Sequence, residues 1–242
     1  MPKSKALPPR CITFDLDDTL WPCAPAIERA ERALHAFLAE RCPAIASQYS
    51  IEGLRSHRQA IAEQHPELRH DLGALRRRSL QALARQCGYP NGWEEEAIAR
   101  FYEHRNRVEL FEGVIGLLED LRARFRLGVV TNGNADVGRI GIGHLFDFTV
   151  RAAEAGAAKP EAGIFKTAIE RAGVRPEQIV HVGDHAGSDV RGAAAAGMRT
   201  VWVNPHLAPW PGGSAPDAVI RSVVGLPEVL DRWAAMAGAQ EA

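Results

Sequence analysis

Residues 11–20 of the chain have the sequence CITFDLDDTL, an apolar run that ends in three closely spaced aspartates. The apolar part, with its β-branched residues, predicts a short buried strand. In a strand Asp15 and Asp17 lie on the same side, and two crowded carboxylates repel each other unless a positive charge lies between them. Mg²⁺ prefers such oxygen ligands. The alternative is an acidic turn in which Asp18 or Thr19 caps a helix.

The composition favours a folded chain with no general affinity for nucleic acid. Of its 242 residues 46% are hydrophobic, and 29 basic against 30 acidic residues give a net charge of −1. No apolar run approaches the roughly 18 residues of a membrane span, so we expect no membrane partner. Residues 1–10 lack the apolar centre of a signal peptide, and the cysteines have no metal-type spacing. We therefore expect a cytoplasmic protein; the sequence does not indicate its oligomeric state.

Hydrophobic spacing divides the chain into a helical part and an alternating part. Helical spacing fills residues 22–108. It predicts four helices, at about 25–42, 50–65, 71–86 and 93–105. From residue 109 onward strands and helices alternate. The predicted strands are 126–131, 148–150, 178–182, 199–203 and 217–220, and the predicted helices are 114–124, 160–173, 188–196 and 226–237.

This alternation is typical of a doubly wound parallel α/β sheet. We expect a core domain made of residues 1–21 and 109–242, with residues 22–108 inserted as a separate helical domain. In such sheets ligands bind outside the carboxyl ends of the strands.

Polar residues follow three of the predicted strands, at residues 15–17, 131–132 and 183–184. If these strands are neighbours, the polar groups converge. Lys159 precedes a predicted helix, and Asp189 follows Asp184 by five residues. Each feature also has an ordinary interpretation, as a turn, a surface lysine or a helix cap. Their common order along the chain is what favours a site.

These segments resemble the four motifs of the haloacid dehalogenase-like (HAD) hydrolase superfamily. The motifs are DLDDTL at residues 15–20, TNG at 131–133, KP at 159–160, and GD at 183–184 followed by Asp189. The resemblance covers the whole α/β core, and it implies a Rossmann-like sheet. The helical insertion lies where members of that superfamily carry an α-helical C1 cap.

The resemblance implies a role for each motif residue. Asp15 would be the nucleophile, because a carboxylate is ordinarily ionised at pH 7 and can form an aspartyl-phosphate. Asp17 would be the general acid and base. Thr131 and the backbone N–H of Asn132 would hold phosphoryl oxygens. Lys159 would neutralise both the nucleophile and the phosphate.

The resemblance also implies a bound Mg²⁺ as cofactor. Its ligands would be the carboxylates of Asp15 and Asp184 and the backbone carbonyl of Asp17. Asp189 would lie behind these ligands and contact them rather than the ion.

Asp17 separates two reactions of the superfamily. The haloacid dehalogenases lack a carboxylate two residues after the nucleophile, since a halide leaving group needs no proton. We therefore predict a Mg²⁺-dependent phosphatase acting on a small-molecule phosphate monoester. The alternatives are a phosphomutase, which shares all four motifs, and a catalytically idle binding protein. Four charges buried together argue against an idle site.

A narrower resemblance is to bacterial phosphatases that act on flavin mononucleotide (FMN) and on 5-amino-6-(5-phospho-ribitylamino)uracil. Its residues lie at 13–20, 70–79, 130–135 and 181–184. His185 departs from that pattern, because an acidic residue is expected there. We expect His185 to influence the electrostatics of the metal site without being a ligand.

Several residues near or in the insertion are candidates for contacting substrate: Trp21, His57, Arg58, His70 and Arg76. Trp21 could stack on an aromatic substrate or could pack at the junction of core and insertion. Arg58 could reach a ligand or extend its charged end into solvent at the helix edge.

Overall fold

The computed structural model describes residues 7–238; residues 1–6, part of the N-terminal segment considered above, and 239–242 lie outside the described residues. The chain forms two compact units. The α/β unit contains the chain up to Trp21, Leu110–Asn132 and the chain from Ile142 onward. The helical unit contains Pro22–Glu109 and Gly133–Gly141. The sequence-based boundaries at residues 22 and 108 remain a prediction about separate domains.

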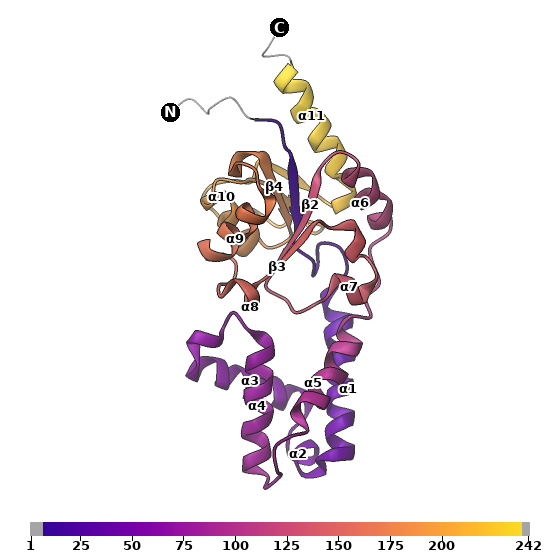
Figure 1. The fold of residues 1–242 in the computed structure, drawn as a ribbon, viewed down its shortest axis with the longest axis vertical. Helices are drawn as coiled ribbons and strands as arrows, with labels where there is room; N and C mark the ends of the chain where they lie inside the picture. The colour runs from indigo at the N-terminus through magenta and orange to yellow at the C-terminus, as the bar shows by residue number, and fades with distance from the viewer. Residues whose placement is uncertain (1–6, 239–242) are drawn as a thin grey trace. The chain divides into compact units, whose positions relative to one another are not determined.

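The α/β unit is built on a parallel six-stranded sheet with the order β3-β2-β1-β4-β5-β6 (Figure 1). Its strands are β1 (Cys11–Phe14), β2 (Arg126–Thr131), β3 (Phe148–Arg151), β4 (Ile179–Gly183), β5 (Arg199–Val203) and β6 (Ala218–Ile220). The chain passes from β1 to one side of the sheet and returns to the other. β1 therefore lies at the topological switch point, which confirms the predicted fold class.

The register of β1 aligns the ends of the three central strands. Phe14, the last residue of β1, is paired with Val129 on β2 and with Val182 on β4. All four residues of β1 are buried, as expected for a central strand of a parallel sheet. The segments that follow β1, β2 and β4 therefore leave the same edge of the sheet.

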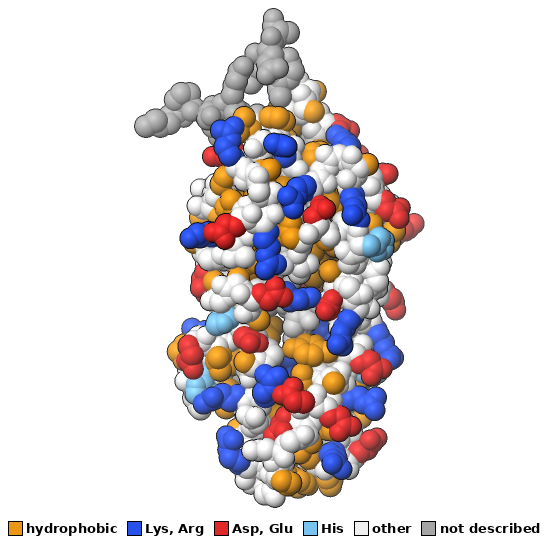
Figure 2. Space-filling model, viewed as in Figure 1, with side chains coloured by type: hydrophobic (Ala, Val, Ile, Leu, Met, Phe, Trp, Pro, Cys, Tyr) orange, Lys and Arg blue, Asp and Glu red, His pale blue; other side chains and the backbone are white. Residues whose placement is uncertain are grey.

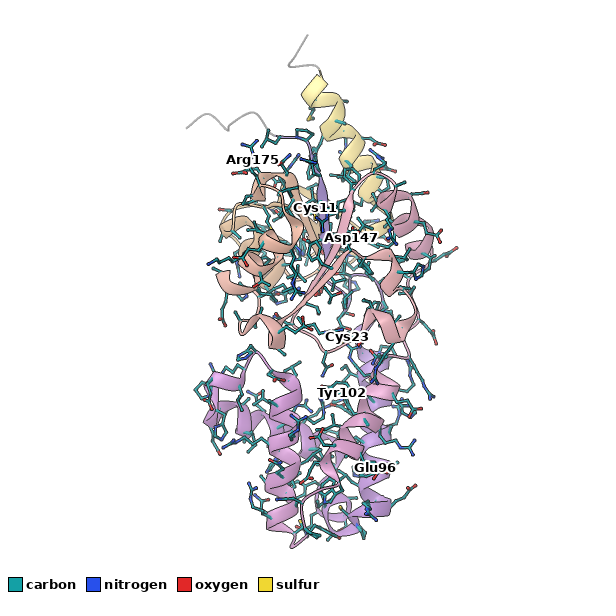
Figure 3. All side chains as sticks on the ribbon, in the orientation of Figure 1. Cys11, Cys23, Glu96, Tyr102, Asp147 and Arg175 are labelled. Atoms are coloured by element: carbon teal, nitrogen blue, oxygen red, sulfur yellow. The ribbon has the colours of Figure 1, made fainter. Side chains whose placement is uncertain are left out.

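Helices cover both faces of this sheet. They are α6 (Val114–Arg122), α8 (Ala152–Ala155), α9 (Ala162–Ala172), α10 (Gly192–Ala195) and α11 (Leu226–Gly238). In Figure 1, α9 and α10 lie on one side of the sheet and α6 and α11 on the other. Cys11 of β1, labelled in Figure 3, packs with Ile164 and Phe165 of α9 in one buried cluster. Burial raises the pKa of the Cys11 thiol to about 12.

The prediction of one helix over residues 188–196 is wrong. The chain instead forms η4, a π-helical turn at Ala186–Arg191, before the short α10. The carbonyl of His185 accepts the N–H groups of both Asp189 and Val190. A wider turn of this kind does not change the hydrophobic spacing enough to be seen in the sequence, and such turns are frequent at functional sites.

The helical unit contains α1 (Cys23–Arg41), α2 (Pro43–Gln48), α3 (Ile51–Gln64), α4 (Leu72–Gln86), α5 (Glu94–Arg105) and α7 (Val137–Ile140). The predicted N-cap of α4 is confirmed, since Asp71 accepts the N–H of Ala74 at 2.8 Å. The helix α2 was not predicted, because six residues are too few to show a period. Apolar residues of α1, α4 and α5, among them Leu34, Leu83 and Phe101, form the core of this unit.

The distribution of charge on the surface agrees with the small net charge of the sequence. On the face drawn in Figure 2, basic and acidic side chains are interspersed. Within residues 7–238, no helix combines the length and the apolar character that crossing a bilayer requires.

Candidate active site

The carboxyl ends of β1, β2 and β4 bring the three predicted polar segments to one edge of the sheet. Asp15 follows β1, and its N–H donates to the carbonyl of Val182 on β4 at 2.9 Å. Thr131, which is buried, is the last residue of β2. Asp184 directly follows β4. The convergence follows from strand order, because the three strands are neighbours.

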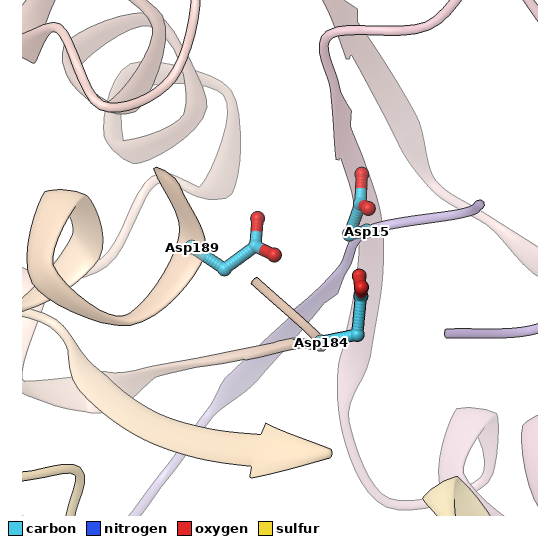
Figure 4. A group of neighbouring side chains, drawn as sticks. All are labelled: Asp15, Asp184 and Asp189. Carbon is cyan, nitrogen blue, oxygen red and sulfur yellow. The ribbon is translucent and has the colours of Figure 1, made fainter. Parts of the chain in front are cut away.

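Three carboxylates form a compact acidic cluster at this edge. Oxygen atoms of Asp15, Asp184 and Asp189 all lie within 4.8 Å of one another. In Figure 4 the Asp189 side chain is directed toward Asp15 and Asp184, and the three residues come from separate segments. Carboxylates at this spacing repel one another unless cations lie between them.

Lys159 supplies one of those cations. Its Nζ lies 2.6 Å from Asp15 Oδ1 and 2.7 Å from Asp189 Oδ1, and it donates to the carbonyl of Val130 at 2.8 Å. The side chain of Asn132 fixes the lysine backbone: Oδ1 accepts the Lys159 N–H at 2.7 Å, and Nδ2 donates to the Lys159 carbonyl at 2.9 Å. Asn132 therefore positions Lys159, a contact that the sequence did not indicate.

Asp17 is held by the tryptophan that follows the first motif. The Nε1–H of Trp21 donates to Asp17 Oδ1 at 3.0 Å, and the Asp18 N–H donates to the Trp21 carbonyl at 2.7 Å. Asp18 has a φ of 59°, which closes the turn between them. Trp21 is 0% exposed, so its ring offers no face for stacking on a substrate. Of the two interpretations for Trp21, packing is the one that agrees with the structure.

Asp184 is positioned by two residues that the sequence did not single out for this role. The hydroxyl of Thr19 donates to Asp184 Oδ1 at 3.3 Å, so it contacts the acidic cluster instead of capping a helix. The Nε1–H of Trp202 on β5 donates to the Asp184 carbonyl at 2.7 Å. Trp202 is distant in sequence, and nothing in its own segment predicts this contact.

Asp189 lies behind the other two carboxylates. Besides its ion pair with Lys159, its Oδ2 accepts the N–H of His185 at 2.9 Å, and its Oδ1 lies 3.4 Å from Nε2 of the buried His181. His181 is held in turn by Thr13, with Nδ1 and Oγ1 separated by 2.9 Å. Because both oxygens of Asp189 already have protein partners, Asp15 and Asp184 are better placed to hold a cation.

His185 has a local structural role. Its ring nitrogen Nδ1 accepts the N–H groups of Gly187 at 3.2 Å and Ser188 at 3.0 Å, at the start of the π-helical turn. An acceptor at this point is what an acidic side chain would also supply, so the imidazole replaces it in this cap. The influence of His185 on a bound metal stays a prediction.

The electrostatics of the cluster indicate a shortage of positive charge. Burial raises the pKa of Asp15 to about 7, although Lys159 acts to lower it. Burial and then Asp189 raise the pKa of Asp184 to about 6. Burial acts to raise the pKa of Asp189, but Lys159 and His181 outweigh it and the pKa is lowered. The raised pKa of Asp15 departs from the expectation for an ordinary carboxylate, and a further cation beside it would lower that pKa.

This donor set fits a divalent cation. Asp15 and Asp184 both have raised pKa values, and the single ammonium of Lys159 is shared between Asp15 and Asp189. Such oxygen-rich surroundings are what Mg²⁺ prefers. Asp15 and Asp184 would hold the ion. The candidates of the insertion lie in the helical unit: His57 and Arg58 on α3, Arg76 on α4, and His70 just before α4.

Comparisons with known proteins agree with this geometry. Residues 9–197 match the haloacid dehalogenase-like hydrolase family. The 5-amino-6-(5-phospho-D-ribitylamino)uracil phosphatase YigB of Escherichia coli is 34% identical over 199 residues, which are 81% of this chain and 83% of YigB. A glyceraldehyde 3-phosphate phosphatase of Methanopyrus kandleri is 33% identical over 202 residues, which are 79% of this chain and 82% of that protein.

A solved structure is also similar. The 2-haloacid dehalogenase from Pseudomonas syringae pv. Tomato is 41% identical, with a TM-score of 0.88 over 93% of this chain and 99% of that chain. The chain therefore belongs to the haloacid dehalogenase-like hydrolase family and is a hydrolase. The names of its relatives differ in the bond that is broken, a phosphate ester in two of them and a carbon–halogen bond in the third.

Proposed function

We propose that the protein is a Mg²⁺-dependent phosphatase that hydrolyses a small-molecule phosphate monoester through an aspartyl-phosphate on Asp15. The observation that carries the proposal is the fixed position of the Asp17 carboxylate, which accepts the Trp21 Nε1–H. Asp17 lies two residues after Asp15, the candidate nucleophile, which Lys159 contacts. A held carboxylate at this place is useful for a leaving group that needs a proton, and an alkoxide needs one whereas a halide does not.

The proposed reaction has two steps, and each residue has one task in each. An Asp15 oxygen attacks phosphorus, the bond from phosphorus to the ester oxygen breaks, and Asp17 gives its proton to that oxygen. Asp17 then takes a proton from water, whose oxygen attacks the phosphorus of the aspartyl-phosphate. The acyl–phosphate bond breaks, which releases inorganic phosphate and restores the Asp15 carboxylate.

Fixed positive charge supports both steps. Lys159 offsets the negative charge of Asp15 and of the phosphoryl group. Thr131 and the Asn132 N–H would bind phosphoryl oxygens. When bound, Mg²⁺ would supply further positive charge to the phosphoryl oxygens. Asp15, Asp184 and the Asp17 carbonyl would be its ligands.

The name of YigB supports a riboflavin-pathway phosphate as substrate, and FMN is a related candidate. The name of the Methanopyrus kandleri relative supports a small sugar phosphate instead. All of these are phosphate monoesters. A cytoplasmic location agrees with the cysteines, none of which forms a disulfide.

The test is phosphate release from a panel of monoesters with and without Mg²⁺: FMN, sugar phosphates, nucleoside monophosphates and 5-amino-6-(5-phospho-D-ribitylamino)uracil. We expect release from at least one of them, dependent on Mg²⁺ and reduced to background in Asp15→Asn. Undiminished release by Asp15→Asn would refute the nucleophile assignment. An isomerised sugar phosphate without free phosphate would identify a phosphomutase, and binding without any turnover would identify a binding protein.

A second candidate, dehalogenation of a 2-haloacid, is favoured by the name of the Pseudomonas syringae relative. Asp17→Asn distinguishes the two reactions, because it keeps an oxygen to accept the Trp21 N–H. Loss of a general acid lowers phosphatase kcat by about 10²–10⁴-fold, whereas halide release from 2-chloropropionate needs no proton. Halide release that exceeds phosphate release in the wild type and survives in Asp17→Asn would replace the phosphatase proposal.

A further inference from the structure

Arg76 on α4 is a buried cation in the helical unit. The residue is only 5% exposed, and the face of its guanidinium lies 3.4 Å from the centre of the Phe101 ring on α5. Stacking on the ring fixes the plane of the group, and cation–π attraction offsets a part of its desolvation. Stacking uses the face of the guanidinium, and the N–H donors lie in its plane, where other groups have to accept them.

Two of the three guanidinium nitrogens have no acceptor in the part of the chain that the structure describes. Nε and Nη1 of Arg76 are buried and make no hydrogen bond to any residue that the structure describes. No carboxylate within residues 7–238 forms an ion pair with this guanidinium either. A buried donor without an acceptor is costly, and a buried charge without a counter-charge costs more. Burial lowers the pKa of Arg76 to about 9.

The arginines around Arg76 increase this cost, and Glu31 offsets a part of it. Arg58 and Arg105 act on it with the same sign of charge. The buried carboxylate nearby is Glu31 on α1, which is already engaged: it accepts Arg55 Nε at 2.7 Å and lies 3.8 Å from Arg58. Glu31 therefore already pairs with two other guanidinium groups, those of Arg55 and Arg58. Positive charge is in excess here, and an added anion would balance it.

Polar groups continue along the same helices. Ser79 lies one turn after Arg76 on α4, is buried, and has its Oγ 2.7 Å from Nδ1 of His57 on α3. The sequence identified His57, Arg58 and Arg76 separately. The fold brings them onto facing segments of α3 and α4.

We propose that the helical unit carries an oxyanion-binding site. In it Arg76, stacked on Phe101, binds a carboxylate or phosphate group through the N–H groups of Nε and Nη1. The anion is a free one such as inorganic phosphate or citrate, and its binding does not depend on the proposed phosphatase function.

The test measures anion-dependent thermal stability of the full chain without Mg²⁺. Wild type, Arg76→Met and the matched control Arg85→Met, which alters an exposed arginine of the same helix, are titrated with inorganic phosphate and with citrate. We expect an anion-dependent rise in Tm of about 2–4 °C or more in wild type and control. Arg76→Met should equal or exceed the wild-type Tm without anion and should lose most of the rise. Anion binding to Lys159 contributes equally to all three proteins.

The proposal is overturned if Arg76→Met lowers Tm in every buffer and keeps the full anion-dependent rise, since Arg76 would then only pack against Phe101. If Arg76→Met does not fold, Arg76→Gln undergoes the same measurements. The thermal readout needs no turnover. An Arg76-dependent rise in a protein that hydrolyses no ester would refute the phosphatase and leave this site standing.

Discussion

At the scale of single residues, the polar groups of the candidate site are held in place by buried neighbours. Trp21 holds Asp17, Asn132 holds the backbone of Lys159, and Thr13 holds His181 behind Asp189. Each of these hydrogen bonds holds a reactive or charged residue in one orientation. This pre-organisation matters because catalysis by charge stabilisation depends on groups that are already oriented before the reaction starts.

The Trp21–Asp17 hydrogen bond gives a prediction at this scale. Trp21→Phe keeps an aromatic ring in the packing and removes the Nε1–H donor. A hydrogen bond to a charged group contributes about 1.5–3 kcal/mol, so we expect phosphatase kcat to fall by about tenfold or more with little change in KM. Steady-state kinetics on the best ester of the panel measures it. The matched control is Trp233→Phe on α11, whose ring contacts Arg199 instead of the site. Equal kcat in Trp21→Phe and wild type would show that Asp17 needs no such support.

At the scale of elements, the site depends on how β4 passes into the π-helical turn. Asp184 follows the strand directly, and the turn brings Asp189 back against Gly183, the last residue of β4. The absence of a side chain at Gly183 is what permits this approach. A Cβ at that position would lie 2.4 Å from Cγ of Asp189, closer than atoms can approach.

Gly183→Ala is therefore expected to displace the Asp189 carboxylate from Lys159. Overpacking of this kind costs about 1–3 kcal/mol of unfolding free energy, and a displacement near 1 Å costs about a hundredfold in kcat. The control is Gly116→Ala on α6, where an added Cβ meets nothing within 4 Å. It should leave kcat unchanged and raise the unfolding free energy by up to about 1 kcal/mol. Urea unfolding and kinetics of both variants test the pair, and a fully active Gly183→Ala would contradict the role given to this contact.

At the scale of the whole molecule, the acidic cluster links stability to pH and to metal. Burial raises the pKa of Asp184 from 3.8 to about 6. A carboxyl whose pKa is raised by folding stabilises the protein below its unfolded pKa, and the contribution is lost as the pH rises through the folded pKa. Asp15, raised to about 7, acts in the same direction. The lowered pKa of His181 acts in the opposite direction below about 6.5, so a difference between variants is needed.

We therefore predict that, with chelator present, the unfolding free energy of the wild type relative to Asp184→Asn falls as the pH rises from 4 to 7. Urea unfolding at several pH values measures it. Mg²⁺ should reverse the trend, because the ion binds the deprotonated carboxylates of the folded protein and releases their protons. A difference that is independent of pH, with and without Mg²⁺, would mean that Asp184 neither has a raised pKa nor holds a metal.

The sequence by itself determined the order of elements and the chemistry of the motif residues. Alternating strands and helices after residue 109 predicted the parallel sheet. Because β2, β1 and β4 are neighbours in that sheet, Asp15, Thr131 and Asp184 lie at the same edge, as expected. These features depend on local hydrophobic period and on general rules of parallel sheets, both of which can be recognised from one chain.

Only the tertiary structure decided the contacts between residues distant in sequence. Lys159 and Asp15 are 144 positions apart, and Thr19 and Asp184 are 165 apart. Three further features also depend on the tertiary structure: the raised pKa of Asp15, the π-helical turn before α10, and the two buried nitrogens of Arg76 that find no acceptor within residues 7–238. The physical reason is that burial and electrostatic environment are set by the groups that surround a side chain in space. The chain therefore predicted which groups react, and the fold set their charge states and their partners.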